Sequence, residues 1–401
     1  MDRILLGQLG ANGDCLYATI LARQLRKDFP DAHITWAISS QCAGLLRNNP
    51  HINAVWEVPI PGWDLHESMW RLFEREATRR LVRHDFDHAY FSQIWPNNFQ
   101  NFDGTIRPSI LRSYGRPITV PIENVIHLTD EEKHRADRYV SEAGVSSFEH
   151  RILFECTSKS GQSHMTIDLA QEIAQHIYAA LPSTTVILST NLPVQLAHPN
   201  SRYVGHLSLR ECAHLSRHCS LFVGAGSGGT VAATSTAAAY RIPIIQVLAE
   251  STSVFASFKH DFEHFGLDAT HMLETTEESA KRIAKIVVVA CRDGIEAACS
   301  RFERRIKVRF QHYLNIVEMN LMKQYRFLDA AQSLATTAQR YGWQTDLVNF
   351  ASRRIAPHLS ADPAWLFASR RREGELFRAQ LDVAQRQPVN RTPALNVNRQ
   401  G

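Results

Sequence analysis

Short apolar runs alternate with amphipathic stretches along the first 150 residues. In Cys15–Asp28 the apolar side chains recur at helical spacing, which predicts a helix with one buried face. Strands alternating with helices are typical of a parallel, doubly wound sheet. The predicted strands are Arg3–Leu9, His33–Ser39, Ile52–Val58 and His88–Phe91, and the predicted helices are Cys15–Asp28, Gln41–Arg47, Glu67–Arg83 and Asp130–Ala143.

The same alternation restarts after a turn-like segment, Gly144–Ser147. The predicted strands of this second half are Arg151–Glu155, Thr184–Ser189, Ser220–Val223 and Ile242–Leu248, and its predicted helices are Ile167–Leu181, Leu209–Ser216 and Thr230–Tyr240. The sequence therefore predicts two α/β halves of similar build. The crevice between such halves is the expected place for a ligand.

Beyond Glu277 the pattern is almost entirely helical, with predicted helical stretches over 277–326, 327–342, 344–355 and 363–384. The polar, Pro/Asn-rich end of the chain is typical of a disordered tail. Four parts are expected: Rossmann-like domains over 1–148 and 149–295, a helical C-terminal extension over 296–384, and a disordered tail over 385–401.

Composition excludes several classes of protein. Of the 401 residues, 44% are hydrophobic and 21% are charged, so a fully disordered chain is excluded. Lys and Arg number 44 against 40 Asp and Glu, an excess too small to indicate nucleic-acid binding. The seven cysteines form no C-x-x-C pair, which argues against a structural zinc site or a disulfide framework. The N-terminus does not resemble a signal peptide, and a cytoplasmic protein without a metal is expected.

A glycine-rich loop, Gly7–Asp14, joins the first strand to the first helix. Its spacing is G-x-x-G-x-x-G, and the second strand ends without the acidic residue that would hold a ribose, so a dinucleotide site is disfavoured. Asp14 stands where the helix begins. It suits a helix cap, and it equally suits a general base at the mouth of the crevice. These two roles are not exclusive.

Two loops of the second half have the chemistry of phosphate sites. Gly224–Thr230 follows a strand and opens a helix, so its backbone N–H groups and the hydroxyls of Ser227 and Thr230 can hold an anion. A tight turn that permits close packing is the alternative. Cys156–His164 places Lys159 among hydroxyl groups, which suits a diphosphate, although a solvated surface lysine would look the same.

Several phrases of the chain, in this order, resemble family-nine glycosyltransferases, the heptosyltransferases that build lipopolysaccharide cores. These are the Gly-Asp turn at Gly13-Asp14, Phe29–Trp36, Leu45–Ile52, Asp85–Asp87, Leu209–Leu215 and Ala237–Ile245. No single phrase is diagnostic, and the resemblance extends over about residues 1–250.

The resemblance implies a GT-B fold, in which two Rossmann-like domains face a central cleft. It implies an inverting, metal-independent enzyme that transfers a heptose-like sugar from a nucleotide diphosphate donor to a hydroxyl of a bacterial glycan or glycolipid. No cofactor is expected besides this donor substrate. By position, Asp14 would be the base, with Asn12 and Gly13 shaping its loop. The donor-binding residues would be Ser158, Lys159, Ser227, Gly228, Gly229 and Thr230.

The chain also departs from the family. Gly226 stands where family members usually carry an acidic residue, and nothing familiar matches residues 300–401. Basic runs in that region, such as Arg370–Arg372, suit a solvated helix face or, alternatively, contact with the inner face of a membrane. Two other functions stay open. One is a GT-B protein that binds a nucleotide or glycan without turnover. The other is a nucleotide-sugar epimerase, for which His164 and Glu250 offer themselves.

Overall fold

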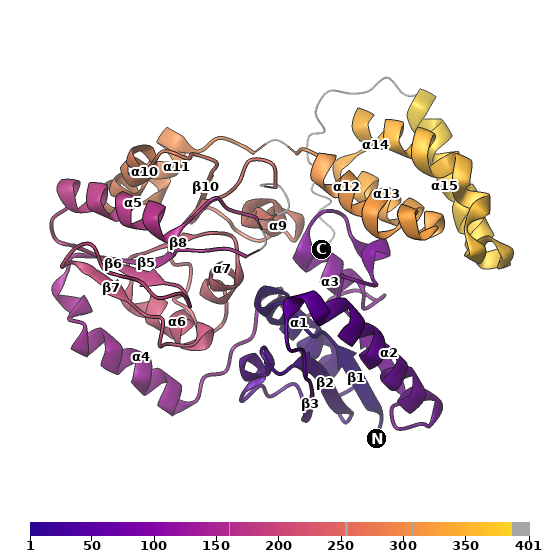
Figure 1. The fold of residues 1–401 in the computed structure, drawn as a ribbon, viewed down its shortest axis with the longest axis horizontal. Helices are drawn as coiled ribbons and strands as arrows, with labels where there is room; N and C mark the ends of the chain where they lie inside the picture. Colours follow the sequence, from indigo (N-terminus) through magenta and orange to yellow (C-terminus); the bar gives the residue numbers. More distant parts are fainter. Residues whose placement is uncertain (160, 253–255, 307, 387–401) are drawn as a thin grey trace. The chain divides into compact units, whose positions relative to one another are not determined.

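The structure is a computed structural model that describes residues 1–159, 161–252, 256–306 and 308–386. Its contacts divide the chain into two compact units (Figure 1). The first unit comprises Met1–Gln93 and Ile110–Val308, and the second comprises Ile94–Ser109 and Arg309–Gly401. Nearly all of the predicted disordered tail lies outside the described residues.

The first sheet of unit 1 has four parallel strands in the order β3-β2-β1-β4. These strands are β1 (Arg3–Gly7), β2 (His33–Ser39), β3 (Ala54–Val58) and β4 (His88–Phe91). Helix α2 (His66–Val82) covers one face, where Trp70 and Phe73 pack with Leu5 of β1. Helix α1 (Asn12–Asp28) is buried along most of its length, so it contacts more than the sheet alone.

The second sheet has six parallel strands in the order β10-β9-β8-β5-β6-β7. They are β5 (His150–Glu155), β6 (Thr184–Ser189), β7 (Ser201–Tyr203), β8 (Leu221–Gly224), β9 (Ile244–Val247) and β10 (Met272–Thr275). The helices of this half are α4 (Asp130–Glu142), α5 (Ile167–Ala180), α6 (Leu209–Leu215), α7 (Gly228–Ala233), α9 (Phe258–His264), α10 (Ala280–Asp293) and α11 (Ile295–Phe302). Helices α5 and α10 lie on one face of the sheet and α6 on the other (Figure 1). Two parallel sheets flanked by helices confirm the predicted α/β architecture.

Three predicted helices differ from the structure. Gln41–Arg47 contains only a short 3-10 segment, η1 (Ala43–Leu46). The predicted helix Thr230–Tyr240 is correct only in its first turn, because α7 spans Gly228–Ala233 and ends there. There the Thr234 hydroxyl bonds the Val231 carbonyl oxygen at 2.9 Å, and the chain turns. The long stretch 277–326 is broken at Gly294, whose φ of +91° is incompatible with a continuous helix.

Some elements were missed altogether. Strands β7 and β10 and helices α9 and α3 (Ile106–Arg112) are short, and their sequences carry no sustained periodicity. The seven cysteines are free, as expected from their spacing. Among the described residues, no helix is both long enough and apolar enough to cross a membrane.

Unit 2 is helical. Its helices are α12 (Gln311–Asn320), α13 (Phe327–Tyr341), α14 (Thr345–Phe350) and α15 (Ala368–Arg386), joined by 3-10 and π segments over 322–324, 351–355, 356–361 and 363–366. The Ser333 hydroxyl donates to the carbonyl oxygen of Phe102 at 2.5 Å. Arg340 pairs with the fully buried Asp103 at 3.2 Å. Ile94–Ser109 is thereby part of the core of this unit, whereas the predicted domain boundaries near 148 and 295 stay predictions.

Candidate functional site

The two glycine loops of unit 1 meet. One leads from β1 into α1, and the other leads from β8 into α7. A Cβ atom added to Gly13 would lie 3.3 Å from Val231 Cγ2, and one added to Gly228 would lie 3.4 Å from the Cβ of Asn12. This close approach explains the small residues. The structure therefore brings together Asn12, Gly13 and Gly228, which the sequence predicted for the two sides of one site.

Asp14 lies in the first turn of α1 beside this contact. Its carboxylate accepts a hydrogen bond from the Ala11 N–H. Burial raises the pKa of Asp14 to about 7, and the Ala11 hydrogen bond only partly opposes that effect. The predicted N-cap role is wrong in position, because α1 begins at Asn12 with Ala11 as its N-cap residue and Asp14 lies inside the first turn. The role of Asp14 as a base stays a prediction, and a pKa near 7 is compatible with it.

Two buried glutamines hold the first glycine loop. Gln93 Oε1 accepts hydrogen bonds from the N–H groups of Leu9 and Gly10, both at 3.0 Å. The side-chain amide of Gln8 donates to Gln93 Oε1 at 2.9 Å and to the Gly10 carbonyl oxygen at 2.7 Å. Sequence reasoning missed both residues. The available signal was Gln8 itself, a polar residue directly after an apolar strand.

The second glycine loop is an anion nest, and the anion it holds is the carboxylate of Glu155 at the end of β5. Glu155 is 5% exposed. Its Oε1 accepts from the Ser227 hydroxyl at 2.5 Å and the Gly229 N–H at 2.7 Å. Its Oε2 accepts from the Ala225 N–H at 2.9 Å and the Thr230 hydroxyl at 2.7 Å. Three of the four residues predicted to cradle a diphosphate in this loop therefore bind an internal carboxylate.

The backbone of this loop explains its glycines. A Cβ atom added to Gly229 would lie 2.3 Å from Glu155 Oε1, so only glycine leaves room for the carboxylate. Gly226 has a φ of +65°, a conformation that strains any L side chain. A Cβ added there would also lie 3.0 Å from Leu248 Cδ2. An acidic residue at 226 would be strained in this conformation of the loop.

Ser158 and Lys159 line a different part of the second half. They border a cavity of about 840 Å³ at the carboxyl ends of β5 and β6. Asp168 and Gln171 of α5 and Asn191, which follows β6, contribute polar groups to its wall. The residues that line this cavity do not include Ser227–Thr230. The predicted donor-binding residues thus fall into two groups, one at the cavity and one at the nest.

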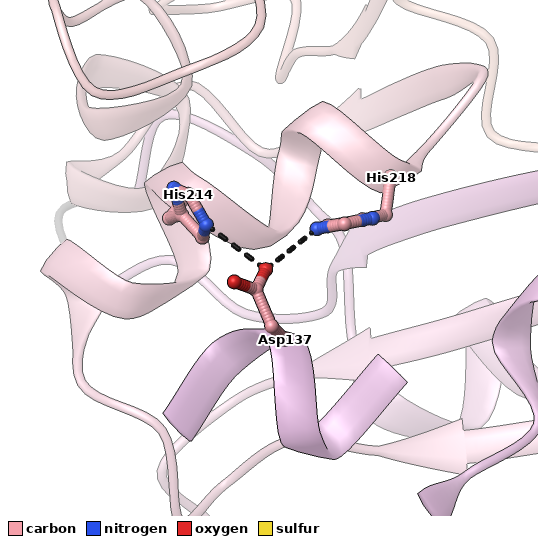
Figure 2. Close-up of side chains that lie close together, drawn as sticks. All are labelled: Asp137, His214 and His218. Carbon is pink, nitrogen blue, oxygen red and sulfur yellow. Dashed lines mark hydrogen bonds and ion pairs between the residues drawn. The ribbon is translucent and has the colours of Figure 1, made fainter. Parts of the chain in front are cut away.

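Three side chains with metal-ligand chemistry lie together on α4 and at the end of α6: Asp137, His214 and His218 (Figure 2). Sequence reasoning predicted no metal site and did not single out these residues. The spacing of the two histidines, four apart in a helical segment, was the available signal. His164, proposed for the epimerase alternative, is placed with its Nε2 3.1 Å from the Glu277 carbonyl oxygen.

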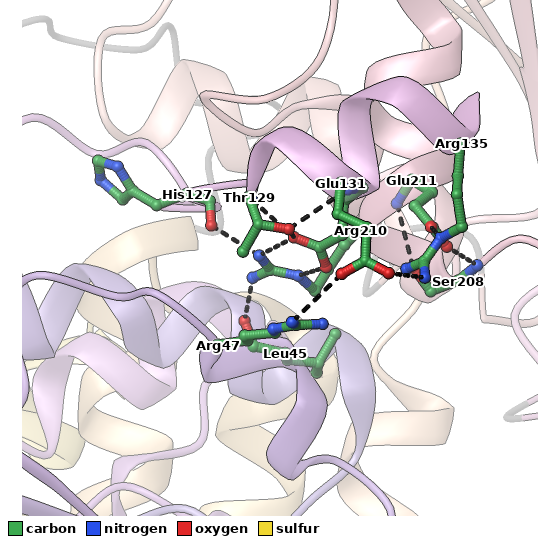
Figure 3. Close-up of polar contacts among 10 residues, drawn as sticks. Leu45, Arg47, His127, Thr129, Glu131, Arg135, Ser208, Arg210 and Glu211 are labelled. Carbon is green, nitrogen blue, oxygen red and sulfur yellow. Dashed lines mark hydrogen bonds and ion pairs between the residues drawn. The ribbon is translucent and has the colours of Figure 1, made fainter. Parts of the chain in front are cut away.

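A buried ion pair joins α4 to α6, and its arginine also donates to the first α/β half (Figure 3). Arg210 of α6 pairs with Glu132 of α4 at 2.7 Å, and both side chains are 4% exposed. Arg210 also donates to the carbonyl oxygens of Leu45, in the first half, and His127, in the connecting segment, at 2.9 and 2.6 Å. Burial would raise the pKa of Glu132, but the hydrogen bonds from Arg210 and Thr129 lower it to about 2.

Several solved structures are similar to this chain. The chain is similar to the crystal structure of a family 9 glycosyl transferase from Veillonella parvula, with 17% identity and a TM-score of 0.52, covering 74% of this chain and 94% of that one. The E. coli ADP-heptose lipopolysaccharide heptosyltransferase II is 15% identical with a TM-score of 0.46, covering 73% and 99%. A structure described as a putative UDP-N-acetylglucosamine 2-epimerase from Listeria monocytogenes is 10% identical with a TM-score of 0.47, covering 79% of this chain and 95% of that one.

No protein-family model matches the chain, and no curated protein matches it in sequence. The likeness to the Veillonella structure shows the fold. It confirms the predicted GT-B architecture and, at the level of the fold, the resemblance to family-nine glycosyltransferases.

Proposed function

We propose that the protein is a glycosyltransferase that uses a nucleotide diphosphate sugar. The observation that carries this proposal is the position of Asp14, a carboxyl group in the first turn of α1, where the glycine loops of the two α/β halves meet. Burial at this position raises its pKa to about 7. A base must be ionised at the working pH and still attract a proton strongly, and a pKa near 7 meets both requirements. The GT-B fold raises the expectation of transfer from a nucleotide sugar, by analogy.

In this mechanism Asp14 accepts the proton of an acceptor hydroxyl. The oxygen of that hydroxyl forms a bond to the anomeric carbon of the donor as the bond to the diphosphate breaks. The electron pair of the broken bond leaves with the nucleoside diphosphate. Attack from the opposite face inverts the anomeric carbon. Lys159 would stabilise the departing diphosphate without a metal ion.

We assign the diphosphate to Ser158 and Lys159 beside the cavity; the predicted contact of Gly228 with the donor stays a prediction. The donors of Ser227, Gly229 and Thr230 are already satisfied by Glu155, so we assign these three residues to holding the loop. The cavity of about 840 Å³ beside Lys159 is large enough for a nucleoside. The motif resemblance favours a heptose-like sugar and an acceptor on a bacterial glycan or glycolipid.

The donor site is tested by thermal unfolding with ADP, GDP, UDP, CDP, CMP and NAD. A nucleotide at about 100 times its Kd stabilises the folded state by about 2.7 kcal/mol, which raises Tm by several degrees. One nucleoside diphosphate should stand out. The shift should shrink in Lys159→Ala and persist in Lys281→Ala, which removes an exposed lysine from α10 of the same half. No shift with any nucleotide would contradict the donor site.

A second candidate is a GT-B protein that binds a nucleotide or glycan without turnover. The specific observation in its favour is the Glu155 carboxylate, which takes four donors of the predicted phosphate loop. Nucleotide binding without consumption of any sugar donor would support this candidate. Isomerisation of the donor alone would instead indicate an epimerase.

A further inference from the structure

Asp137, His214 and His218 form a compact, partly exposed group in unit 1 that is not part of the site described above (Figure 2). The Nε2 atoms of His214 and His218 lie 3.0 and 2.9 Å from the same carboxylate oxygen, Asp137 Oδ1. The potential ligand atoms of the three side chains all lie within 4.8 Å of one another. Three side chains, from α4, from α6 and from the short segment that follows α6, thus converge on one point.

This spacing is close to what a tetrahedral metal ion requires. Zinc binds histidine nitrogen and carboxylate oxygen at about 2.0–2.2 Å, which places neighbouring ligand atoms about 3.3 Å apart. The two observed N–O separations need to widen by only a few tenths of an ångström. His214 and His218 are four residues apart, so helical geometry puts both rings on one side. Two imidazoles and one carboxylate are a ligand set suited to zinc.

The position also favours a cation. His214 lies in the last turn of α6, and His218 ends the 3-10 segment Ser216–His218 that follows it. The carbonyl groups at the end of a helix carry partial negative charge and attract a cation. The side chains of His214, His218 and Asp137 are 15%, 35% and 47% exposed. An ion can therefore reach the site from solvent, and water can supply a fourth ligand.

We propose that Asp137, His214 and His218 bind a zinc ion, or a divalent ion of similar preference, that links α4 to α6. Zinc takes the Nε2 atom of each neutral ring and one oxygen of Asp137. The remaining proton of each ring then sits on Nδ1. The ion adds a third connection between two helices that the pairs Glu132–Arg210 and Arg135–Glu211 already join. The site is structural, and it does not depend on the proposed glycosyl transfer.

The test is calorimetric titration of the full-length, untagged protein with ZnCl₂, since an affinity tag would bind the ion itself. We expect one zinc ion per chain. Asp137→Asn, His214→Gln and His218→Gln should each weaken binding by at least the ~10–100-fold that the loss of a supporting group costs at metal sites. His134→Gln is the matched control, because His134 is an exposed histidine on α4 outside the group. It should bind zinc as the wild type does.

A second readout separates ligation from misfolding. Co²⁺ bound in a tetrahedral site should give visible absorption bands in the wild type and in His134→Gln, and these bands should disappear in His214→Gln. Circular dichroism of each variant without metal should match that of the wild type. Equal zinc affinity in the wild type and Asp137→Asn would overturn the proposal. An equal loss of zinc affinity in His134→Gln and His214→Gln would also overturn it.

Discussion

The carboxyl group of Asp14 combines a structural bond to the Ala11 N–H with a pKa of about 7. If it is the base of the reaction, wild-type turnover rises with pH through about 7 and levels off above it, because only the ionised form accepts a proton. Asp14→Asn should lower turnover about 10²–10⁴-fold at pH 8, and it should remove this pH dependence. Nucleotide affinity, measured by thermal shift, should not change. Undiminished turnover in Asp14→Asn would show that another group is the base.

The same pKa makes a prediction about stability. The folded protein holds the Asp14 proton up to about pH 7, whereas the ordinary pKa is 3.8, so the folded state binds more protons between these values. Its stability therefore falls as pH rises through this window. Asp14→Asn avoids burying the charge and should raise Tm at pH 8 by about 2–4 °C. Below pH 4 the difference should vanish. The exposed Asp31→Asn serves as the control, and a loss of stability in Asp14→Asn at pH 8 would refute the argument.

Glu155 is the residue on which the second glycine loop depends. Glu155→Gln replaces one acceptor oxygen by an NH₂ group that faces donors, so part of the nest is left unsatisfied. We expect a loss of about 2–3 kcal/mol in the free energy of unfolding, measured with denaturant. The exposed Glu142→Gln should cost less than about 0.5 kcal/mol. Equal stability of the two variants would show that the nest does not need its charge.

At the scale of elements, α4 and α6 are joined through a buried ion pair. Arg210→Met leaves the Glu132 carboxylate buried without its cation and should cost about 3–5 kcal/mol in urea unfolding. Adding Glu132→Gln, which removes the charge and keeps an acceptor for the Thr129 N–H, should recover part of that loss. If the losses in the free energy of unfolding of the two single variants simply add up in the double variant, the two side chains do not interact.

Acid unfolding gives an independent measure of this pair. The pKa of Glu132 is lowered from 4.5 to about 2, so its contribution to stability is fully present above pH 4.5. It is lost as the pH falls through about 2. Glu132→Gln should therefore flatten the dependence of stability on pH between 4.5 and 2.

The longer strands and amphipathic helices of both halves could be predicted because their apolar residues recur regularly. Where prediction failed, local contacts overrode the pattern. Alanine favours a helix over Thr230–Tyr240, yet hydroxyl-to-carbonyl bonds after Ala233 end α7 there. Glycine spacing singled out the loop of Asp14 and the second glycine loop in the sequence, while the role of Asp14 as a base stays a prediction. The sequence could not show that Glu155 occupies the second glycine loop, because Glu155 precedes the residues it bonds there by 70 to 75 positions. A local sequence pattern contains no information about such a distant contact.

At the scale of the whole molecule, segments that are far apart in the sequence form one compact unit. Ile94–Ser109 lies between strands and helices of unit 1 but belongs to the helical unit 2, where Asp103 pairs with Arg340, 237 residues away. Some arginines of the basic runs beyond residue 300 form ion pairs with acidic side chains of the same compact unit. Arg301 pairs with Asp293, and Arg370 pairs with Asp329. Their paired charges favour a solvated helix face over a membrane contact, although membrane association stays a prediction.

The central claim, that the chain transfers sugar from a nucleotide donor, is tested by the release of nucleoside diphosphate. The wild type and Asp14→Asn are incubated at pH 8 with ADP-, GDP-, UDP- and CDP-linked sugars, with and without a bacterial glycolipid fraction as acceptor. We predict that the wild type releases one nucleoside diphosphate in a manner that depends on the acceptor. Asp14→Asn should release it at no more than about 1% of that rate. A protein that binds the nucleotide but consumes none of these donors would contradict the claim and identify a binding protein.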